Sequence, residues 1–204
     1  MAASRSVRSA RSGAKSPVSL EKIQTEAVKL FSEKTYPVVG MRDISDAVGL
    51  LPGSLYAHIA TKEELLLGIV KRGIQNYINT LGPISASDKS APERLRLITR
   101  KYMETLDATM DQTKVSFQQW TYLGPENRDQ IVKLREDYEA IFTRVINSTE
   151  FPSLSHPRIA VLSTMGLLNS AMRWYHPGAS LTPTEIGDAL ADYALNGLTG
   201  QTPA

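Results

Sequence analysis

The stretch that decides the fold runs from Arg42 to Val70 and reads RDISDAVGLLPGSLYAHIATKEELLLGIV. Gly49 suits the left-handed conformation that ends a helix, and Pro52 suits the first turn of the next helix, where its missing N–H costs nothing. We therefore predict a helix-turn-helix, with short helices over residues 41–48 and from residue 52 onward. The side chains expected to pack between the two helices are Ile44, Ala47, Val48, Leu55 and Ile59.

A helix-turn-helix places the first residues of its second helix in the major groove of DNA. Small residues at positions 53 and 54 let the backbone approach phosphates, and the Ser, Tyr and His side chains can hydrogen-bond to phosphates or base edges. The alternative interpretations are a core aromatic for Tyr56 and a surface or helix-capping residue for His58. Lys62 opposes the dipole of the helix that it begins, so we favour a phosphate partner for it over water. The predicted DNA contacts are Arg42, Pro52, Gly53, Ser54, Tyr56, Ala57, His58 and Lys62.

Charge is distributed unevenly along the 204 residues. Residues 1–78 hold 11 Lys and Arg against 7 Asp and Glu, a net charge of +4, whereas residues 79–204 hold 12 against 14, a net charge of −2. A basic end on a slightly acidic body indicates a polyanionic partner such as double-stranded DNA. The alternative is a basic tail that only keeps the chain in solution.

Helical signals continue along the whole chain, and no useful length alternates with a period of two, so the predicted fold class is all-α. Thr61–Glu64 forms a capping box for a long helix that ends near residue 81. Later helices are expected at about 92–110, 113–122, 126–148, 156–175 and 182–199. The predicted organisation is a basic disordered arm over 1–17, a three-helix helix-turn-helix unit with the long helix over 18–81, and a larger helical domain over 82–204.

The quoted stretch resembles the signature of the tetracycline-repressor (TetR) family of bacterial transcription regulators, over roughly residues 20–72. This resemblance implies a homodimer that reads an inverted repeat in DNA, with Tyr56, His58 and Lys62 on the phosphate backbone and base readers within residues 51–57. It further implies a repressor whose domain over 82–204 binds a small-molecule effector and dimerises. The matching positions are Ile44, Ala47, Gly49, Gly53, Leu55, Tyr56, His58, Lys62, Glu63 and Leu65.

Four positions depart from the family pattern. Leu51 stands where a Ser or Thr often caps the recognition helix, and Val39 and Gly40 lack a common Thr hydroxyl. Ile59 replaces a common Phe, which is a conservative change in the core. One alternative is therefore a helical interaction module with a degenerate helix-turn-helix that no longer binds specific DNA. A second alternative, an α-helical enzyme, has no positive support in the sequence.

The segment Arg158–Leu198 contains two predicted helices, and the first is apolar on nearly every side, as in a helix buried on most of its surface. Its end resembles the end of many TetR-family chains, where the last two helices pair with their mates in a four-helix dimer interface. The residues predicted at this interface are Leu162, Leu168, Trp174, Ile186 and Leu190.

Aromatic and Met side chains gather between residues 103 and 172. One interpretation is an ordinary helical core with surface arginines, and the other is an effector cavity. The segment FQQWTYLGPENRDQIVKLREDYEAIF resembles the sensor domains of family members that respond to acyl-CoA thioesters, which implies an acyl-CoA-like or other apolar ligand. The segment NSAMRWY lacks the Trp after Asn169 that is associated with that subgroup. The predicted pocket residues are Met103, Phe117, Trp120, Tyr138, Phe142, Met165, Asn169 and Met172.

The sequence contains no motif typical of a catalytic site or of a metal site. The chain has no Cys, which excludes a thiol nucleophile and a Cys-ligated zinc site. The three His residues are far apart and lack metal-ligand spacing, and there is no glycine-rich phosphate loop. We therefore expect a non-enzyme without a cofactor. The basic start of the chain lacks an apolar signal segment and no run is long enough to span a membrane, so we expect a cytoplasmic location.

Overall fold

The computed structural model describes residues 19–151 and 154–199, so the predicted basic arm over 1–17 lies outside the described residues. Every regular element within those ranges is a helix, which confirms the all-α prediction. In chain order the helices are α1 (Leu20–Lys34), α2 (Met41–Val48), α3 (Pro52–Leu55), α4 (Lys62–Ser85), α5 (Ala91–Ala108), α6 (Met110–Gln118), the 3₁₀ turn η1 (Trp120–Tyr122), α7 (Pro125–Ile146), α8 (Pro157–Trp174) and α9 (Pro183–Thr199).

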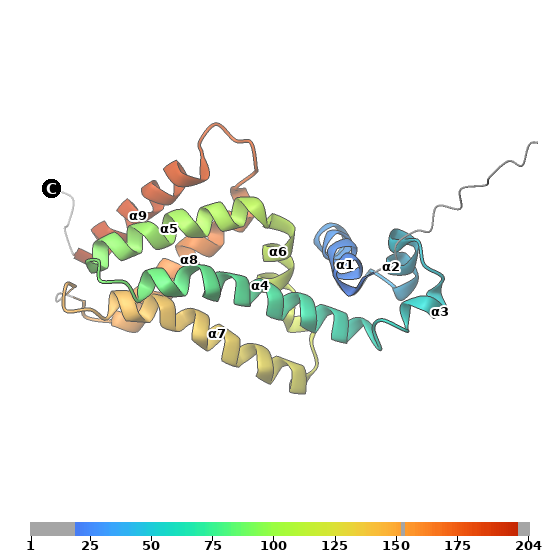
Figure 1. Cartoon of the computed structure of the whole chain (residues 1–204). Helices are drawn as coiled ribbons and strands as arrows, with labels where there is room; N and C mark the ends of the chain where they lie inside the picture. Colours follow the sequence, from blue (N-terminus) through green and yellow to red (C-terminus); the bar gives the residue numbers. More distant parts are fainter. Residues whose placement is uncertain (1–18, 152–153, 200–204) are drawn as a thin grey trace, which may run out of the picture.

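Helices α1–α3 form a small unit at one end of the molecule (Figure 1). The Ser19 hydroxyl caps α1 by accepting a hydrogen bond from the backbone N–H of Lys22 at 3.2 Å. Gly49 ends α2 with φ 72°, the left-handed conformation that glycine adopts without strain. The side chains of Phe31, Ile44 and Leu55, from the three helices, are fully buried together in the core.

Helix α4 connects this unit to the rest of the chain and runs the length of the helical body (Figure 1). Its first turn is capped by the Thr61 hydroxyl, which accepts from the backbone N–H of Glu64 at 3.0 Å. The Glu64 carboxylate accepts from the backbone N–H of Ala60 at 3.1 Å, one residue before the cap. The helix passes the predicted end at residue 81 and continues through Pro83 to Ser85. The long helix therefore belongs to both parts of the molecule, and the predicted boundary after residue 81 cuts its last turn.

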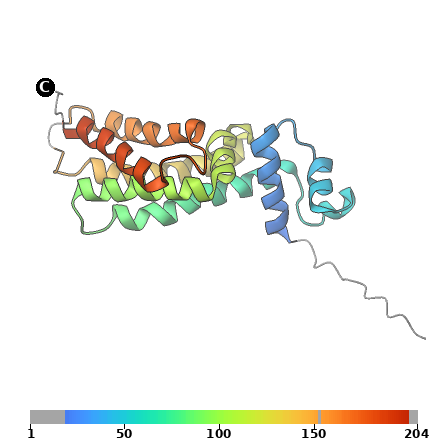
Figure 2. The same cartoon turned by 90° about the horizontal axis from the view of Figure 1, so that it is seen from above.

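The remaining helices pack around α4 to form the body, with α5 against α9 and α7 against both α4 and α8. Figure 2 shows α8 and α9 along one edge of the body, and α6 between the body and α1. The closest approach is between α5 and α9, where a Cβ on Gly187 would lie 2.6 Å from the Cα of Arg100. Only glycine, which has no Cβ, therefore lets the two backbones pack so closely at position 187.

Aromatic rings from α4, α5, α6 and α7 form the centre of the body. Tyr77 lies against Tyr102 with ring centroids 5.1 Å apart and against Phe117 at 5.4 Å. Tyr138 completes the cluster, 5.3 Å from Phe117 and 5.4 Å from Phe142. Such edge-to-face and tilted pairs stabilise a core beyond the area that they bury. Within residues 19–151 and 154–199, no helix is long and apolar enough to cross a membrane.

Candidate nucleic-acid interface and effector cavity

Helix α3 and the turn after it form an exposed surface at the tip of the molecule. Leu55 is fully buried and anchors the short helix, while the six predicted contact residues within 52–58 are exposed. Tyr56 is 55% exposed, which excludes the core alternative for this residue in the isolated protomer. Leu51 is 77% exposed and α3 has no side-chain cap, as expected where a hydroxyl residue is replaced by Leu. Pro52 at the first turn begins the helix without that cap.

The predicted DNA contact on α2, which is Arg42, is exposed. Arg42 lies at the start of α2 with its guanidinium 4.0 Å from the Asp46 carboxylate, an exposed and therefore weak ion pair. The amide of Gly40 before it donates to the Asp43 carboxylate at 2.7 Å, so a side-chain hydroxyl is not needed to begin α2. Val39 is buried in the core, which explains why an apolar residue is tolerated there.

Lys62 requires a correction to the reasoning from sequence. Its ammonium donates to the backbone carbonyls of Tyr36 at 3.0 Å and Val39 at 2.7 Å, and lies 4.3 Å from the centre of the Tyr36 ring. Partial burial lowers the pKa of Lys62 from its ordinary value. The Lys62 ammonium at the start of α4 is thus stabilised by two backbone carbonyls of the chain itself. These hydrogen bonds connect α4 to the link between α1 and α2. A phosphate contact through its third N–H stays a prediction.

The body contains a cavity of about 330 Å³ between α6, α7 and α8. Phe117, Asn169 and Met172 of the predicted pocket residues line it, and Trp120 contacts its wall through Arg135. The other lining residues are Gln118, Arg135, Gly166, Ser170 and Arg173. Met103, Tyr138 and Phe142 are buried in the core and do not line this cavity, so their predicted place in an effector pocket stays a prediction. Met165 is half-buried against the core and does not line it either.

The charged residues that line the cavity are all basic. Its lining includes the guanidinium groups of Arg135 and Arg173 and no carboxylate. The hydroxyl of Tyr102 donates to Oδ1 of Asn169 at 3.1 Å and so orients that amide. Behind the Phe117 wall, the Tyr138 hydroxyl is buried and has no hydrogen-bond partner among the described residues. Burial raises the pKa of Tyr138 well above its ordinary value, so this hydroxyl is a neutral donor.

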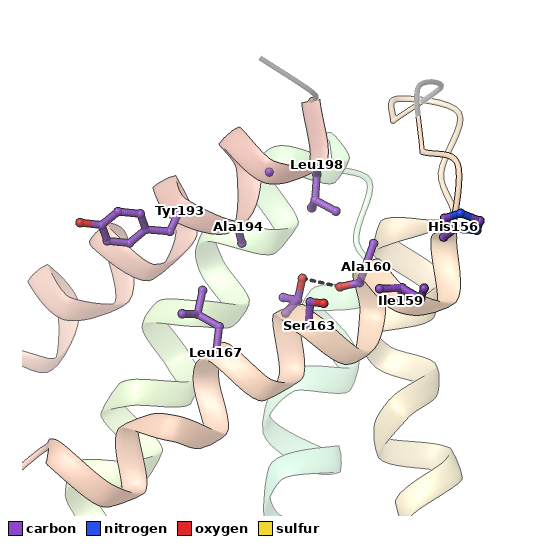
Figure 3. A pocket seen from close by; sticks show the side chains of 10 residues that line it. His156, Ile159, Ala160, Ser163, Leu167, Tyr193, Ala194 and Leu198 are labelled. Carbon is purple, nitrogen blue, oxygen red and sulfur yellow. Dashed lines mark hydrogen bonds between the residues drawn. The ribbon is translucent and has the colours of Figure 1, made fainter. Parts of the chain in front are cut away.

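A second hollow, of about 540 Å³, lies on the surface between α8 and α9. Figure 3 shows Ile159, Ser163 and Leu167 of α8 on one side of it and Tyr193 and Leu198 of α9 on the other. Large side chains are exposed along this surface, with Leu162 46%, Trp174 47% and Tyr193 72% exposed. Exposed apolar surface of this kind is typical of an interface between proteins.

The predicted dimer residues divide into two groups. Leu162 and Trp174 are exposed on α8 and are available to a partner. Leu168 is completely buried, and Ile186 and Leu190 are nearly so, inside the protomer itself. These three face the body because α8 and α9 pack those faces against the other helices, so the exposed residues are the better candidates for a partner contact. The sequence prediction did not include Ile159 and Tyr193, which are exposed. Their spacing from the core positions of the same helices could have indicated that they lie on the outer face.

Three residues of α8 that line the cavity between α6, α7 and α8 were also missed. Gly166, Ser170 and Arg173 of α8 were not in the predicted pocket, although they follow one another at intervals of three and four residues. This spacing places them on one face of a helix that is otherwise apolar. An interrupted polar stripe was therefore the signal for a cavity wall.

Comparison with protein families supports the assignment of both parts of the molecule. Residues 23–69 match the model described as bacterial regulatory proteins, tetR family. Residues 88–198 match the model described as tetracyclin repressor-like, C-terminal domain.

Individual relatives extend over most of the chain. The HTH-type transcriptional repressor KstR2 from Rhodococcus jostii strain RHA1 is 27% identical over 181 residues, which cover 84% of this chain and 87% of that protein. PfmR, a TetR family transcriptional regulator from Thermus thermophilus, has a crystal structure with a TM-score of 0.77 and 25% identity, covering 86% of this chain and 97% of that chain. The structure of AibR in complex with isovaleryl coenzyme A and operator DNA shares the fold, with a TM-score of 0.75, 21% identity, and 85% and 96% coverage.

The match over residues 88–198 alone covers more than half of the 204 residues. The match over residues 23–69 contains the helix-turn-helix whose exposed surface was described above. The chain therefore belongs to the tetracycline-repressor (TetR) family of bacterial regulatory proteins, as a DNA-binding transcriptional regulator rather than an enzyme.

Proposed function

We propose that this chain is a repressor that binds a palindromic operator as a homodimer in the bacterial cytoplasm, and that a small-molecule effector releases it from the DNA. Each protomer would place α3 in the major groove of one half-site. A two-fold symmetric dimer suits a palindrome because both half-sites then meet the same recognition surface. The repressors named KstR2 among its relatives support the sign of regulation.

The observation that carries DNA binding is the state of the side chains around α3. The hydroxyls of Ser54 and Tyr56 and the imidazole of His58 are exposed and have no hydrogen-bond partner in the described part of the protomer. Gly53 beside them has no atom within 4 Å of the position that a Cβ would take, so a phosphate backbone can approach the helix there. We assign Tyr56 and His58 to phosphates, and Ser54 and Ala57 to base edges.

The proposed dimer forms through the exposed surface of α8 and α9. Ile159, Leu162 and Tyr193 would be covered by the same surface of a second copy, because a two-fold axis pairs one patch with itself. The DNA-binding units of both protomers then lie at the same end of the dimer when the axis runs along the long dimension of the molecule. Their recognition helices must be about 34–36 Å apart to reach successive major grooves.

The proposed effector site is the cavity between α6, α7 and α8. Its volume of about 330 Å³ suits the compact part of a small molecule. AibR was crystallised with isovaleryl coenzyme A, and an acyl-CoA-like ligand here would insert its acyl end into the cavity. Other apolar ligands with a short polar group fit the same volume. No resident cofactor is part of the proposal.

The test begins with selection of binding sites from random duplexes, followed by fluorescence anisotropy with the selected duplex. We expect an inverted repeat and a slope of about −5 or steeper for log affinity against log salt concentration, because several phosphates are contacted. A protein with a degenerate helix-turn-helix would instead bind the selected and the random duplex equally at about 0.15 M salt. That outcome would reject the proposed function.

The contact surface is tested by a matched pair of Tyr→Phe substitutions. Tyr56→Phe removes one hydroxyl from the α3 surface and should weaken binding to selected and random duplexes alike, by about tenfold, since a charge-assisted hydrogen bond is lost. Tyr122→Phe removes the same group from the exposed η1 and keeps the ring that stacks on Tyr36, so it should leave affinity unchanged. Equal effects of the two substitutions would remove Tyr56 from the interface. Lys62→Ala cannot serve in this test, because it also breaks two hydrogen bonds inside the protein.

A further inference from the structure

Two arginines and no carboxylate line the effector cavity. Arg135 on α7 and Arg173 on α8 both line it, and neither has a salt-bridge partner within the described residues. Arg135 is half-buried, and burial lowers the pKa of its guanidinium from the ordinary value. Glu139, four residues further along α7, favours the charged form of Arg135 but makes its ion pair with Arg158. An anion in the cavity would further offset the cost of the half-buried charge.

The Arg135 guanidinium is in direct contact with an aromatic ring. Its guanidinium carbon lies 4.8 Å from the centre of the Trp120 ring, a cation–π contact. Trp120 is the first residue of η1, the single 3₁₀ turn that follows α6. The contact is weaker than a charge-assisted hydrogen bond to an anion, so an anionic group that reached Arg135 would compete with the ring for it.

The other end of η1 contacts the DNA-binding unit. Tyr122, the last residue of the turn, stacks on Tyr36 with ring centroids 5.9 Å apart. Tyr36 lies in the link between α1 and α2, and its carbonyl accepts a hydrogen bond from Lys62. The three residues of η1 thus lie between an arginine of the cavity and the link that positions the helix-turn-helix.

Two further contacts join the same segment to the DNA-binding unit. The buried Gln119 side chain accepts from the backbone N–H of Tyr36 at 2.7 Å and donates to the carbonyl of Phe31 at 2.7 Å. On the other side of η1, the backbone N–H of Gly124 donates to the Glu63 carboxylate in the first turn of α4 at 2.8 Å. Any displacement of η1 is therefore passed both to the end of α1 and to the start of α4.

We propose that the effector is an amphipathic anion whose charged group binds Arg135, and that this contact acts on the DNA-binding unit through Trp120, η1 and Tyr36. The inference rests on the proposed role of the cavity as the effector site. Arg173 completes the anion site from α8, and Phe117 and Met172 receive the apolar part of the ligand. When Arg135 turns to the anion, the Trp120 ring loses its partner and η1 is free to shift against Tyr36.

The charge requirement can be tested with two probes that differ by one group, without knowing the natural effector. The probes are 8-anilinonaphthalene-1-sulfonate and N-phenyl-1-naphthylamine, which has the same rings without the sulfonate. In titrations of the full chain, Arg135→Gln should weaken binding of the sulfonate by about tenfold or more and leave the neutral probe within about twofold. Lys133→Gln, which removes an exposed charge from the same helix outside the cavity, should change neither.

The effect of ligand binding on the link between α1 and α2 is measured by hydrogen exchange of the backbone amides in residues 35–40. Saturation with the sulfonate should accelerate exchange there, and the neutral probe should not. In Trp120→Leu the sulfonate should bind at least as tightly, since Arg135 no longer leaves a ring, but the acceleration should disappear. Tyr122→Ala interrupts the same path at a half-exposed position, so it gives the same test if Trp120→Leu does not fold.

Three outcomes would overturn the inference. Equal loss of both probes in Arg135→Gln, or loss of neither, would reject the anion site. Binding of the sulfonate through Arg135 with unchanged exchange in residues 35–40 would reject transmission. Acceleration that survives in both Trp120→Leu and Tyr122→Ala would reject the path through η1. None of these results depends on operator binding by the ligand-free dimer, whose failure would reject the proposed function and leave the probe results interpretable.

Discussion

The crossing of α4 and α6 gives a prediction whose size follows from the geometry. A Cβ on Gly73 of α4 would lie 2.6 Å from the Cβ of Ser116 on α6, with Nε2 of Gln112 at 3.0 Å. Both α6 side chains use the space beside Gly73 to reach the carbonyl of Ile69, Gln112 at 2.7 Å and Ser116 at 3.3 Å. Gly73→Ala must therefore push the two helices apart or break these hydrogen bonds.

Two effects of opposite sign decide the result of Gly73→Ala. Replacing a mid-helix Gly by Ala stabilises a helix by about 1 kcal/mol. Overpacking costs about 1–3 kcal/mol, and each hydrogen bond lost adds about 0.5–1.5 kcal/mol. The net expectation is a loss of about 1–3 kcal/mol, which lowers the Tm of a chain of this size by roughly 3–10 °C.

The assay is thermal unfolding followed by circular dichroism at one fixed protein concentration, because a dimer has a concentration-dependent Tm. Gly166→Ala is the control, since Gly166 lies in the middle of α8 with nothing within 4 Å of an added Cβ, and its Tm should rise. Ser116→Gly combined with Gly73→Ala should restore the close approach, with a coupling of about 1 kcal/mol or more. A Tm for Gly73→Ala that rises as in the control would refute the account of this crossing.

The remaining predictions concern assembly and pH. Leu162→Asp should give folded monomers by sedimentation because Leu162 is exposed on α8, whereas Val132→Asp, at an exposed position on α7, should leave the dimer intact; a dimeric Leu162→Asp protein would place the interface elsewhere. The Asp188 carboxylate accepts from Nε of Arg100 at 2.6 Å and Nη2 at 3.0 Å, and this hydrogen bonding lowers the pKa of Asp188 below its ordinary value. Its contribution to stability is complete above about pH 4 and is lost as the pH falls through the lower pKa of the folded state. Asp188→Asn should therefore lower stability at neutral pH and flatten the acid limb of stability against pH, and an unchanged acid limb would contradict this assignment.

Local signals in the sequence predicted the helices because they act within a few residues. Gly49, Pro52 and Thr61 begin or end helices in the structure as they were expected to. The end of α4 was predicted four residues early, at the start of the polar segment over 82–92, which contains Pro83. A proline in the last turn removes one backbone hydrogen bond, and the burial of Leu81 and Ser85 against the body offsets that loss.

The faces of α8 and the lining of the cavity could not be predicted in the same way. When a helix is apolar on nearly all sides, its sequence does not show which face points to the core. Leu162 and Leu168 therefore look alike in sequence, although Leu162 is exposed and Leu168 is buried. Met103, Tyr138 and Phe142 were placed in the pocket because core and pocket residues share one chemistry. The lining residues that were not predicted include Ser170 and Arg173 of α8, which reach the cavity because α8 packs against α6 and α7, a long-range relation that a local pattern does not contain.

The way that α1 is attached to the body explains how a small ligand can affect DNA binding. The contact of α1 and its following link with α6 includes three side-chain hydrogen bonds, from Ser32 to Asp111 at 2.8 Å and the two made by Gln119. A hydrogen bond contributes about 0.5–1.5 kcal/mol net, so these three together supply only a few kcal/mol. Coupling energies between sites are typically about 1–3 kcal/mol, the same range. An effector that binds two arrangements of η1 with modestly different affinity can therefore shift the orientation of the helix-turn-helix, and no rearrangement of the aromatic core is needed.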